Sequence, residues 1–234
     1  MNPSLKIRKI HRWIGILFSF SALLASGSGV VHNVMTRTQA PPPAARPAGE
    51  SFNLSAINIS LKEAAEKLFS NHAPIHGISF RVFNGDPWYQ FLLEGDQLPF
   101  YVNARTGDVD MYSDEKYARE IAEKYLSRKN LVSVKRLVNF DSEYLNIFRI
   151  LPVYRFDTQD PVNTRVYVST MTGSVTRFTD DKKQIEASIF TNFHKLGFIK
   201  NKDLRDFVLT TTTAGIFVLS LFGVILFFMT FPRR

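Results

Sequence analysis

Two long apolar runs constrain this chain more than any other feature of its sequence. Residues 13–31 include 19 positions in a row without an ionisable side chain, and residues 207–231 include 25 more. A helix needs roughly 20 apolar residues to cross the hydrocarbon core of a bilayer. Both runs are long enough, so the sequence predicts transmembrane helices over 13–32 and 207–231. The second run is the richer in Leu, Phe, Val and Ile.

The first run also has features of a cleaved signal peptide. Basic residues precede it, the apolar stretch 13–25 follows, and the small residues of 26–29 come next. The run nevertheless continues to Val31, and it contains small residues at helical spacing, which allow another helix to approach closely in a bilayer. These residues are Gly15, Ser19, Ala22, Ser26 and Gly29. We therefore expect the first helix to be retained in the mature protein. In the second run, Gly215 is expected to allow the same close approach of another helix.

The positive charge of the chain lies mainly at its two ends. Lys and Arg exceed Asp and Glu by 29 − 21 = 8, and six of the basic residues flank the apolar runs at the two termini. The sequence therefore does not indicate a basic surface that binds the phosphate backbone of a nucleic acid, and nucleic acid is not an expected partner. The positive-inside rule places both termini in the cytoplasm. Residues 33–206 would then lie on the other side, in the periplasm of a bacterial inner membrane.

Several classes of chemistry have no signature in the sequence. The chain has no cysteine, which excludes disulfides, zinc–thiolate sites and a cysteine nucleophile. The patterns Gly-x-Ser-x-Gly, His-Glu-x-x-His and Walker A are also missing. No complete catalytic signature is therefore present, and the sequence leaves open whether the chain is part of an enzyme.

The segment between the apolar runs contains an internal repeat. Residues 101–114 and 167–180 share Tyr, Val, Thr, Gly, Val and Asp at an offset of 66. Upstream, the segment 88–91 corresponds to 153–156, and the segment 63–69 corresponds to 120–126. Such ordered self-similarity indicates a duplicated structural unit. Each copy is predicted to contain one helix followed by two or three strands.

Local patterns predict the elements of each copy. Ser60 and Glu63 have the spacing of a capping box and mark the start of the first helix. Alternation over 88–93 predicts a strand with one packed face and one solvent face. The remaining predicted elements are strands at 77–83, 100–104, 133–139, 151–156 and 165–169 and a helix at 115–128.

The predicted fold class is α+β, with two transmembrane helices flanking two units that each pack a helix on a small antiparallel sheet. Residues 40–48, rich in Pro and Ala, are predicted to form a stiff linker. The predicted organisation is a basic cytoplasmic end at 1–12, a transmembrane helix at 13–32, a linker at 33–50, repeat units at 51–113 and 114–182, a connector at 183–206, a transmembrane helix at 207–231 and a cytoplasmic tail at 232–234.

The repeat, with its Tyr-Val-x-x-x-Thr-Gly-x-Val strand and turn, resembles the PepSY domain. The segment 9–31, with His-Arg-Trp-x-Gly, resembles the first helix of PepSY-associated transmembrane proteins. The segment 193–228 resembles the part of that family that carries a His, then a Gly-bearing bend and then a helix. The resemblance implies a relation to inner-membrane ferric-siderophore reductases, whose helix histidines hold b-type haem. This chain has two apolar runs where the larger members have about four, so two copies or a partner would have to complete a haem site.

Three histidines are the candidate haem ligands that this resemblance implies. His11 precedes the first run, His32 follows it, and His194 precedes the second. Because 21 residues of helix span about 31 Å, His11 and His32 cannot hold one metal ion in one chain. His32 and His194 are expected near the same side of the membrane. His72 and His76 are expected in a solvated turn instead.

Two functions remain open at this point. The first is an accessory subunit in haem-linked electron transfer, such as ferric-chelate reduction. The second is a membrane-anchored binding module, without a cofactor, that captures or regulates a peptidase or an envelope or respiratory complex by strand addition at a free sheet edge. In both cases membrane lipid is an expected partner. We also expect a homodimer or a place in a larger membrane complex.

Overall fold

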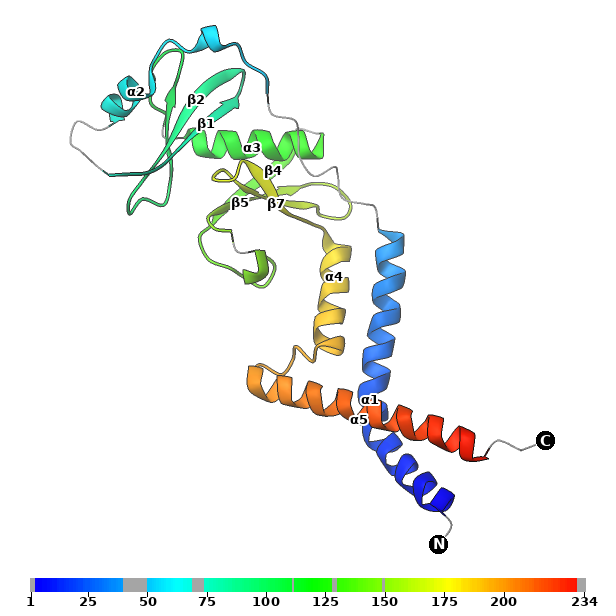
Figure 1. The fold of residues 1–234 in the computed structure, drawn as a ribbon. Coiled ribbons are helices and arrows are strands. Elements are labelled where there is room, and N and C mark those ends of the chain that lie inside the picture. The colour runs from blue at the N-terminus through cyan, green and yellow to red at the C-terminus, as the bar shows by residue number, and fades with distance from the viewer. Residues whose placement is uncertain are drawn as a thin grey trace. The chain divides into compact units, whose positions relative to one another are not determined.

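The computed structural model describes residues 3–39, 50–68, 74–110, 112–127, 130–148 and 150–230. The chain is α+β, as predicted, and consists of two long apolar helices and two small antiparallel sheets (Figure 1). It divides into two compact units. The helical unit comprises residues 1–40 and 182–234, and the α/β unit comprises residues 41–181. The predicted linker at 40–48 and the predicted cytoplasmic tail at 232–234 lie outside the described residues.

The helical unit contains α1 (Pro3–Thr38), most of α4 (Asp181–Ile189), the π-helix η3 (Phe190–His194) and α5 (Lys202–Thr230). Residues 5–38 and 202–230 form helices long and apolar enough to cross a membrane. Their large side chains are open to the surroundings; Leu23 and Phe217, for example, are each 70% exposed. Helix α1 extends past the predicted end at 32, so residues 33–38, expected in a linker, are helical.

Helices α1 and α5 pack against each other through glycines. A Cβ atom added to Gly215 would lie 2.3 Å from the Phe18 ring, so the ring occupies the space that a larger residue would need. A Cβ atom on Gly15 would lie 3.7 Å from Leu219. Because Gly15 precedes Phe18 whereas Leu219 follows Gly215, the two helices run antiparallel. The predicted close packing is confirmed at Gly15 and Gly215. At Gly29, no atom of the described residues lies within 4 Å of an added Cβ, so close packing there stays a prediction that concerns another chain.

The α/β unit contains a three-stranded and a four-stranded antiparallel sheet. The first has the order β1 (Ile75–Phe83), β2 (Asp86–Leu93), β3 (Phe100–Asn103), and α2 (Leu61–Leu68) precedes it. The second has the order β4 (Leu131–Leu137), β5 (Val153–Thr158), β6 (Arg165–Ser169), β7 (Ser174–Thr179), and α3 (Ser113–Leu126) precedes it. Short 3₁₀ turns lie at Leu54–Ala56 and Asn146–Phe148.

The predicted strands and helices are present, with small differences at their ends. Strand β7, helix α4 and the π-helix η3 were not predicted as separate elements. The capping box at the start of α2 is confirmed. The Glu63 amide donates a hydrogen bond to Ser60 Oγ at 3.2 Å, and the Ser60 amide donates to Glu63 Oε2 at 2.8 Å. Two of the free amides at the helix start are satisfied in this way.

Strand register shows that the two sheets are structural copies. Both first strands carry an irregularity at the same place, between Ile75 and Gly77 in β1 and between Leu131 and Ser133 in β4. The isolated bridge between Val102 and Val109 also has a counterpart, at the offset of 66, in the pairing of β6 with β7. In the first copy, Val102 pairs with Tyr89 on one side and with Val109 on the other. In the second copy, Val168 pairs with Tyr154 and with Val175 in the same way. The first copy therefore has a single bridge where the second copy has a fourth strand.

Both faces of the first sheet are covered. Tyr89, Phe91 and Val102 pack with Ala64 of α2 on one face. On the other face, Phe83 and Tyr101 join a core with α3 and with the inner face of the second sheet. The predicted solvent face of 88–93 is therefore wrong: Gln90 on that face is only 3% exposed. Alternation along one strand cannot show that a second sheet and its helix will cover the polar side.

The glycine contact between the helices gives a direct test. Replacement of Gly215 by Leu should separate α5 from α1, because the added side chain would occupy the position of the Phe18 ring. The chain lacks cysteine, so a Gly15→Cys, Leu219→Cys pair can report the contact by oxidative cross-linking. We expect most of the intramolecular cross-link to be lost in Gly215→Leu and retained in the control Gly27→Leu, where an added Cβ has no neighbour within 4 Å among the described residues. Equal cross-linking in both variants would contradict this packing.

Candidate functional site

The three candidate histidines all lie in the helical unit. His11 is on α1, where its Cε1 atom would lie 3.5 Å from a Cβ added to Gly223 of α5. Its Nδ1 atom is buried and has no hydrogen-bond partner in the described part of the chain. His11 therefore contributes to the contact between α1 and α5. The continuous helix confirms that His11 is separated from His32 by about 31 Å.

His32 faces the carboxylate of Glu186 on α4. Its Nδ1 atom lies 2.6 Å from Glu186 Oε1, the distance of an ion pair, although the ring is not aligned for a hydrogen bond. Thr36 and Gln39 also donate hydrogen bonds to the Glu186 carboxylate. The Glu186 side chain is only 13% exposed, so these contacts attach α4 to the end of α1.

His194 is at the end of the π-helix and faces α1. Its Nδ1 atom lies 3.1 Å from the Ala25 carbonyl oxygen and 3.3 Å from Ser28 Oγ. A carbonyl oxygen only accepts, so this contact favours the tautomer with the proton on Nδ1. The lone pair is then on Nε2, the form in which a histidine binds a metal ion.

His32 and His194, expected near the same side of the membrane, both contact a third ring. The Phe190 ring lies 5.0 Å from the His32 ring and is stacked on the His194 ring at 4.5 Å between centroids. A phenyl ring therefore occupies the space between the two imidazoles. In one chain, these residues do not fit haem held between two histidines. The haem expectation remains a prediction that requires histidines from a second chain.

The other two histidines lie outside the helical unit in sequence. His76 is on β1, so its predicted place in a turn is wrong, and His72 lies outside the described residues. Within the described ranges, no group of three or more His, Asp or Glu side chains is placed to hold a metal ion.

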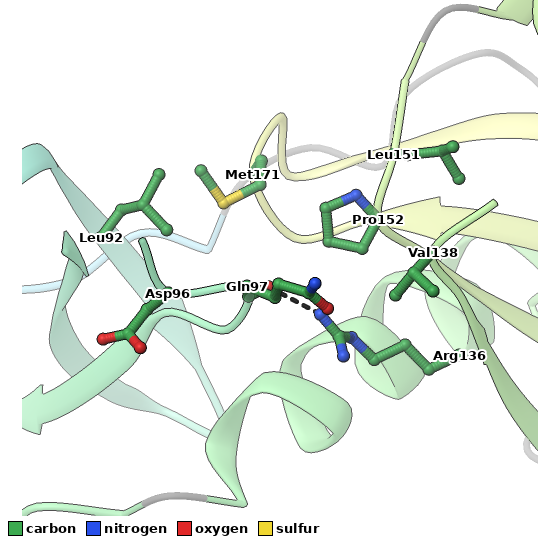
Figure 2. Close-up of a pocket in the computed structure, with 8 residues that line it drawn as sticks. All are labelled: Leu92, Asp96, Gln97, Arg136, Val138, Leu151, Pro152 and Met171. Carbon is green, nitrogen blue, oxygen red and sulfur yellow. Dashed lines mark hydrogen bonds between the residues drawn. The ribbon is translucent and has the colours of Figure 1, made fainter. Parts of the chain in front are cut away.

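A groove in the α/β unit is the other candidate site, and sequence reasoning missed it. It lies where the two sheets meet and has a volume of about 340 Å³ (Figure 2). Its apolar lining comes from both copies of the repeat: Leu92, Val138, Leu151, Pro152 and Met171. The polar lining consists of Arg136 at the end of β4 and of Asp96 and Gln97 in the loop between β2 and β3. These residues are far apart in sequence and show no motif.

A buried polar network holds the two copies together beside this groove. Arg81 donates a hydrogen bond at 2.7 Å to the carbonyl oxygen of Met171, which lines the groove, and Gln90 donates at 3.2 Å to the Thr170 carbonyl. Gln90 also donates to the Tyr101 hydroxyl, and that hydroxyl donates to Asp114 Oδ1, each at 2.7 Å. The turn between β6 and β7 is thus attached to the first sheet.

Tyr101 is the centre of the network and is fully buried. Burial raises the pKa of its phenol, and the neighbouring Asp114 carboxylate raises that pKa further. The phenol therefore stays protonated and donates to Asp114 throughout the neutral range. Its repeat counterpart, Tyr167, donates its hydroxyl proton to the Glu143 carboxylate. The same position of the repeat thus pairs a tyrosine with a carboxylate in both copies.

Comparison with known proteins adds no assignment. No protein-family model matches the chain, and searches of curated proteins and of solved structures give no significant match.

Removal of the Tyr101 hydroxyl should destabilise the α/β unit. In Tyr101→Phe, the buried Gln90 and Asp114 groups each lose a hydrogen-bond partner, and unfolding should become easier by about 1–3 kcal/mol. Tyr112 is 79% exposed, so Tyr112→Phe should change stability by less than about 0.5 kcal/mol. Urea unfolding of the full chain in detergent, followed by tyrosine and tryptophan fluorescence, measures both. Equal midpoints for the two variants would contradict the central role of Tyr101.

Proposed function

We propose that this chain is a membrane-anchored binding protein whose duplicated α/β unit captures an extended segment of a partner protein. The two apolar helices support the anchoring, because none of the large side chains on α5 is buried by the part of the chain that the structure describes. Apolar surface of this extent is stable only when lipid or another protein covers it. The α/β unit has its own core and needs no such cover.

One observation carries the binding function: each sheet has a free edge at the same position of the repeat. The strand orders place β1 and β4 at edges, and within the described residues no strand pairs with their outer sides. An edge strand presents unpaired amide and carbonyl groups that an extended peptide can complete. The irregularity in each strand lies near its start, so the remainder of each edge is regular.

Apolar side chains exposed on the two edge strands support the capture of a partner segment, as opposed to edges that only face water. Ile78 of β1 is 46% exposed and Val132 of β4 is 50% exposed. A strand that adds to either edge would cover such side chains and would form main-chain hydrogen bonds at the same time. A partner that presents an extended segment, such as a peptidase or a subunit of an envelope complex, suits this mode.

Site-specific photo-cross-linking in membranes tests the proposal. Benzoylphenylalanine at Ile78 or Val132 should give discrete adducts with a partner protein, because both positions lie on free edges. The same probe at Leu54, which is 75% exposed on a 3₁₀ turn, is the matched control and should give none of these adducts. Failure of both edge positions to cross-link, or identical adducts at Leu54, would contradict the proposal.

Haem-linked electron transfer is a second candidate, favoured by the orientation of His194. The Nδ1 contact with Ala25 leaves Nε2 as the ligand atom, and haem would supply one-electron chemistry when bound. The same purified protein separates the two candidates. A Soret band that His194→Ala removes and His76→Ala leaves would favour electron transfer. Its absence in protein purified from haem-replete cells would leave the binding function alone.

A further inference from the structure

The groove between the two repeat copies contains a guanidinium group whose hydrogen-bonding capacity is mostly unused. Arg136 NH2 donates to the Gln97 carbonyl oxygen at 2.6 Å. In the described part of the chain, this is the single hydrogen bond of the guanidinium, and its Nε atom is buried without a partner. A guanidinium has five N–H donors and a fixed positive charge. Most of those donors therefore remain available to a ligand.

The guanidinium of Arg136 lies near carboxylates but is not paired with one: Asp114 and Glu115 act on its cross-strand neighbour Tyr154. No carboxylate of the described residues forms an ion pair with it. Among the described residues, Asp96 is the one acidic residue that lines the groove, and Figure 2 shows its carboxylate pointing away from the guanidinium. The arginine is held in place by Gln97 at one side and by its position on β4 at the other. The positive end of the groove is thus preorganised for an anion.

The rest of the groove is apolar and limited in size. Met171 and Leu92 face Pro152 and Val138 across the space in Figure 2. A volume of about 340 Å³ lies at the small end of the range for ligand pockets, roughly 300–1,000 Å³. The ligand should therefore combine one anionic group with one apolar group of side-chain size.

We propose that this groove binds the C-terminal carboxylate of an extended peptide whose last residue is apolar. The carboxylate would accept two hydrogen bonds from the Arg136 guanidinium, a pairing that matches the planar geometry of both groups. The last side chain would occupy the apolar space lined by Val138, Pro152 and Met171. This inference rests on the proposed binding function, and it names the part of the partner that the α/β unit recognises.

The position of Arg136 favours a peptide over a small organic acid. Arg136 is on β4, the edge strand that is open to strand addition in the second sheet. A peptide paired along β4 could form main-chain hydrogen bonds with that strand and at the same time place its terminal carboxylate near Arg136. A short fatty acid would have only the carboxylate and the apolar contact.

Fluorescence anisotropy with full-length protein in detergent tests the inference. The probe is a fluorescein-labelled pentapeptide, SGAVL, with a free C-terminal carboxylate, and its twin is the same peptide with a C-terminal amide. The free acid should bind at least about tenfold more tightly than the amide, the effect of one hydrogen bond to a charged group. Equal affinities, or no binding of the free acid at millimolar protein, would overturn the proposal.

Variants of Arg136 locate the effect. Arg136→Gln should weaken binding of the free acid by about tenfold or more and leave the amide unchanged. Arg136→Lys retains the charge but lacks the planar fork, and should give an intermediate loss. The control is Arg105→Gln, which removes a guanidinium paired with Asp86 elsewhere in the α/β unit and should leave both affinities unchanged. Circular dichroism confirms that each variant is folded, and the lysine variant keeps the test valid if the glutamine variant unfolds.

Further outcomes distinguish this inference from the binding of a small organic acid and from the proposed binding function. Octanoate that displaces the peptide as well as unlabelled SGAVL does would overturn the assignment to a peptide terminus. Photo-cross-linked adducts at Val132, together with equal affinity for acid and amide, would overturn the carboxylate site and leave the proposed binding function in place. An affinity for the free acid without edge adducts would contradict strand addition instead.

Discussion

The uncovered apolar surface of α1 and α5 is the constraint on which the rest of the structure depends. The two helices contact each other at Phe18 and Gly215, but this crossing covers little of either helix, and side chains such as Phe20 and Phe217 stay exposed. In water, that surface would oppose folding of the helical unit. In a bilayer it needs no other cover, because lipid tails are as apolar as the side chains. The helical unit therefore requires a membrane or a partner, whereas the α/β unit does not.

The α/β unit gains its own stability from duplication. Each copy alone is a small sheet with one helix, too small to bury much apolar surface. Helix α3 contacts both sheets, and the Tyr101 network attaches the turn of the second copy to the first. A groove at this junction is a consequence of the same arrangement. The groove is lined by residues of both repeat copies. In it, Arg136 has a single hydrogen bond within the described residues and lies beside apolar side chains.

Local sequence signals predicted the parts of this fold that local interactions determine. The capping box at Ser60, the strand positions and the small residue at Gly215 each depend on a few neighbouring positions. The repeat was visible because equivalent positions kept similar residues. Features that depend on distant contacts were not predicted. The end of α1 contacts Glu186, more than 140 positions later, and the buried Gln90 donates to the carbonyl oxygen of Thr170. The groove likewise combines residues from 92 to 171.

The histidines illustrate the same limit for the candidate site. Sequence placed His32 and His194 near each other, and the structure agrees, but no local pattern indicated that Phe190 would lie between the two rings. A π-helix turn brings Phe190 and His194 onto one side, facing α1. Histidines that the sequence places near each other can therefore be proposed as joint ligands only when the geometry of the turn between them is known.

Accessibility of single cysteines tests the anchoring most directly, because the chain has no cysteine of its own. Tyr112→Cys places a thiol on the exposed surface of the α/β unit, and Leu5→Cys places one at the start of α1. In spheroplasts treated with a membrane-impermeant maleimide, we expect Tyr112→Cys to be labelled at once and Leu5→Cys to be labelled only after permeabilisation. Labelling of both thiols from the same side would contradict a chain that crosses the membrane through α1.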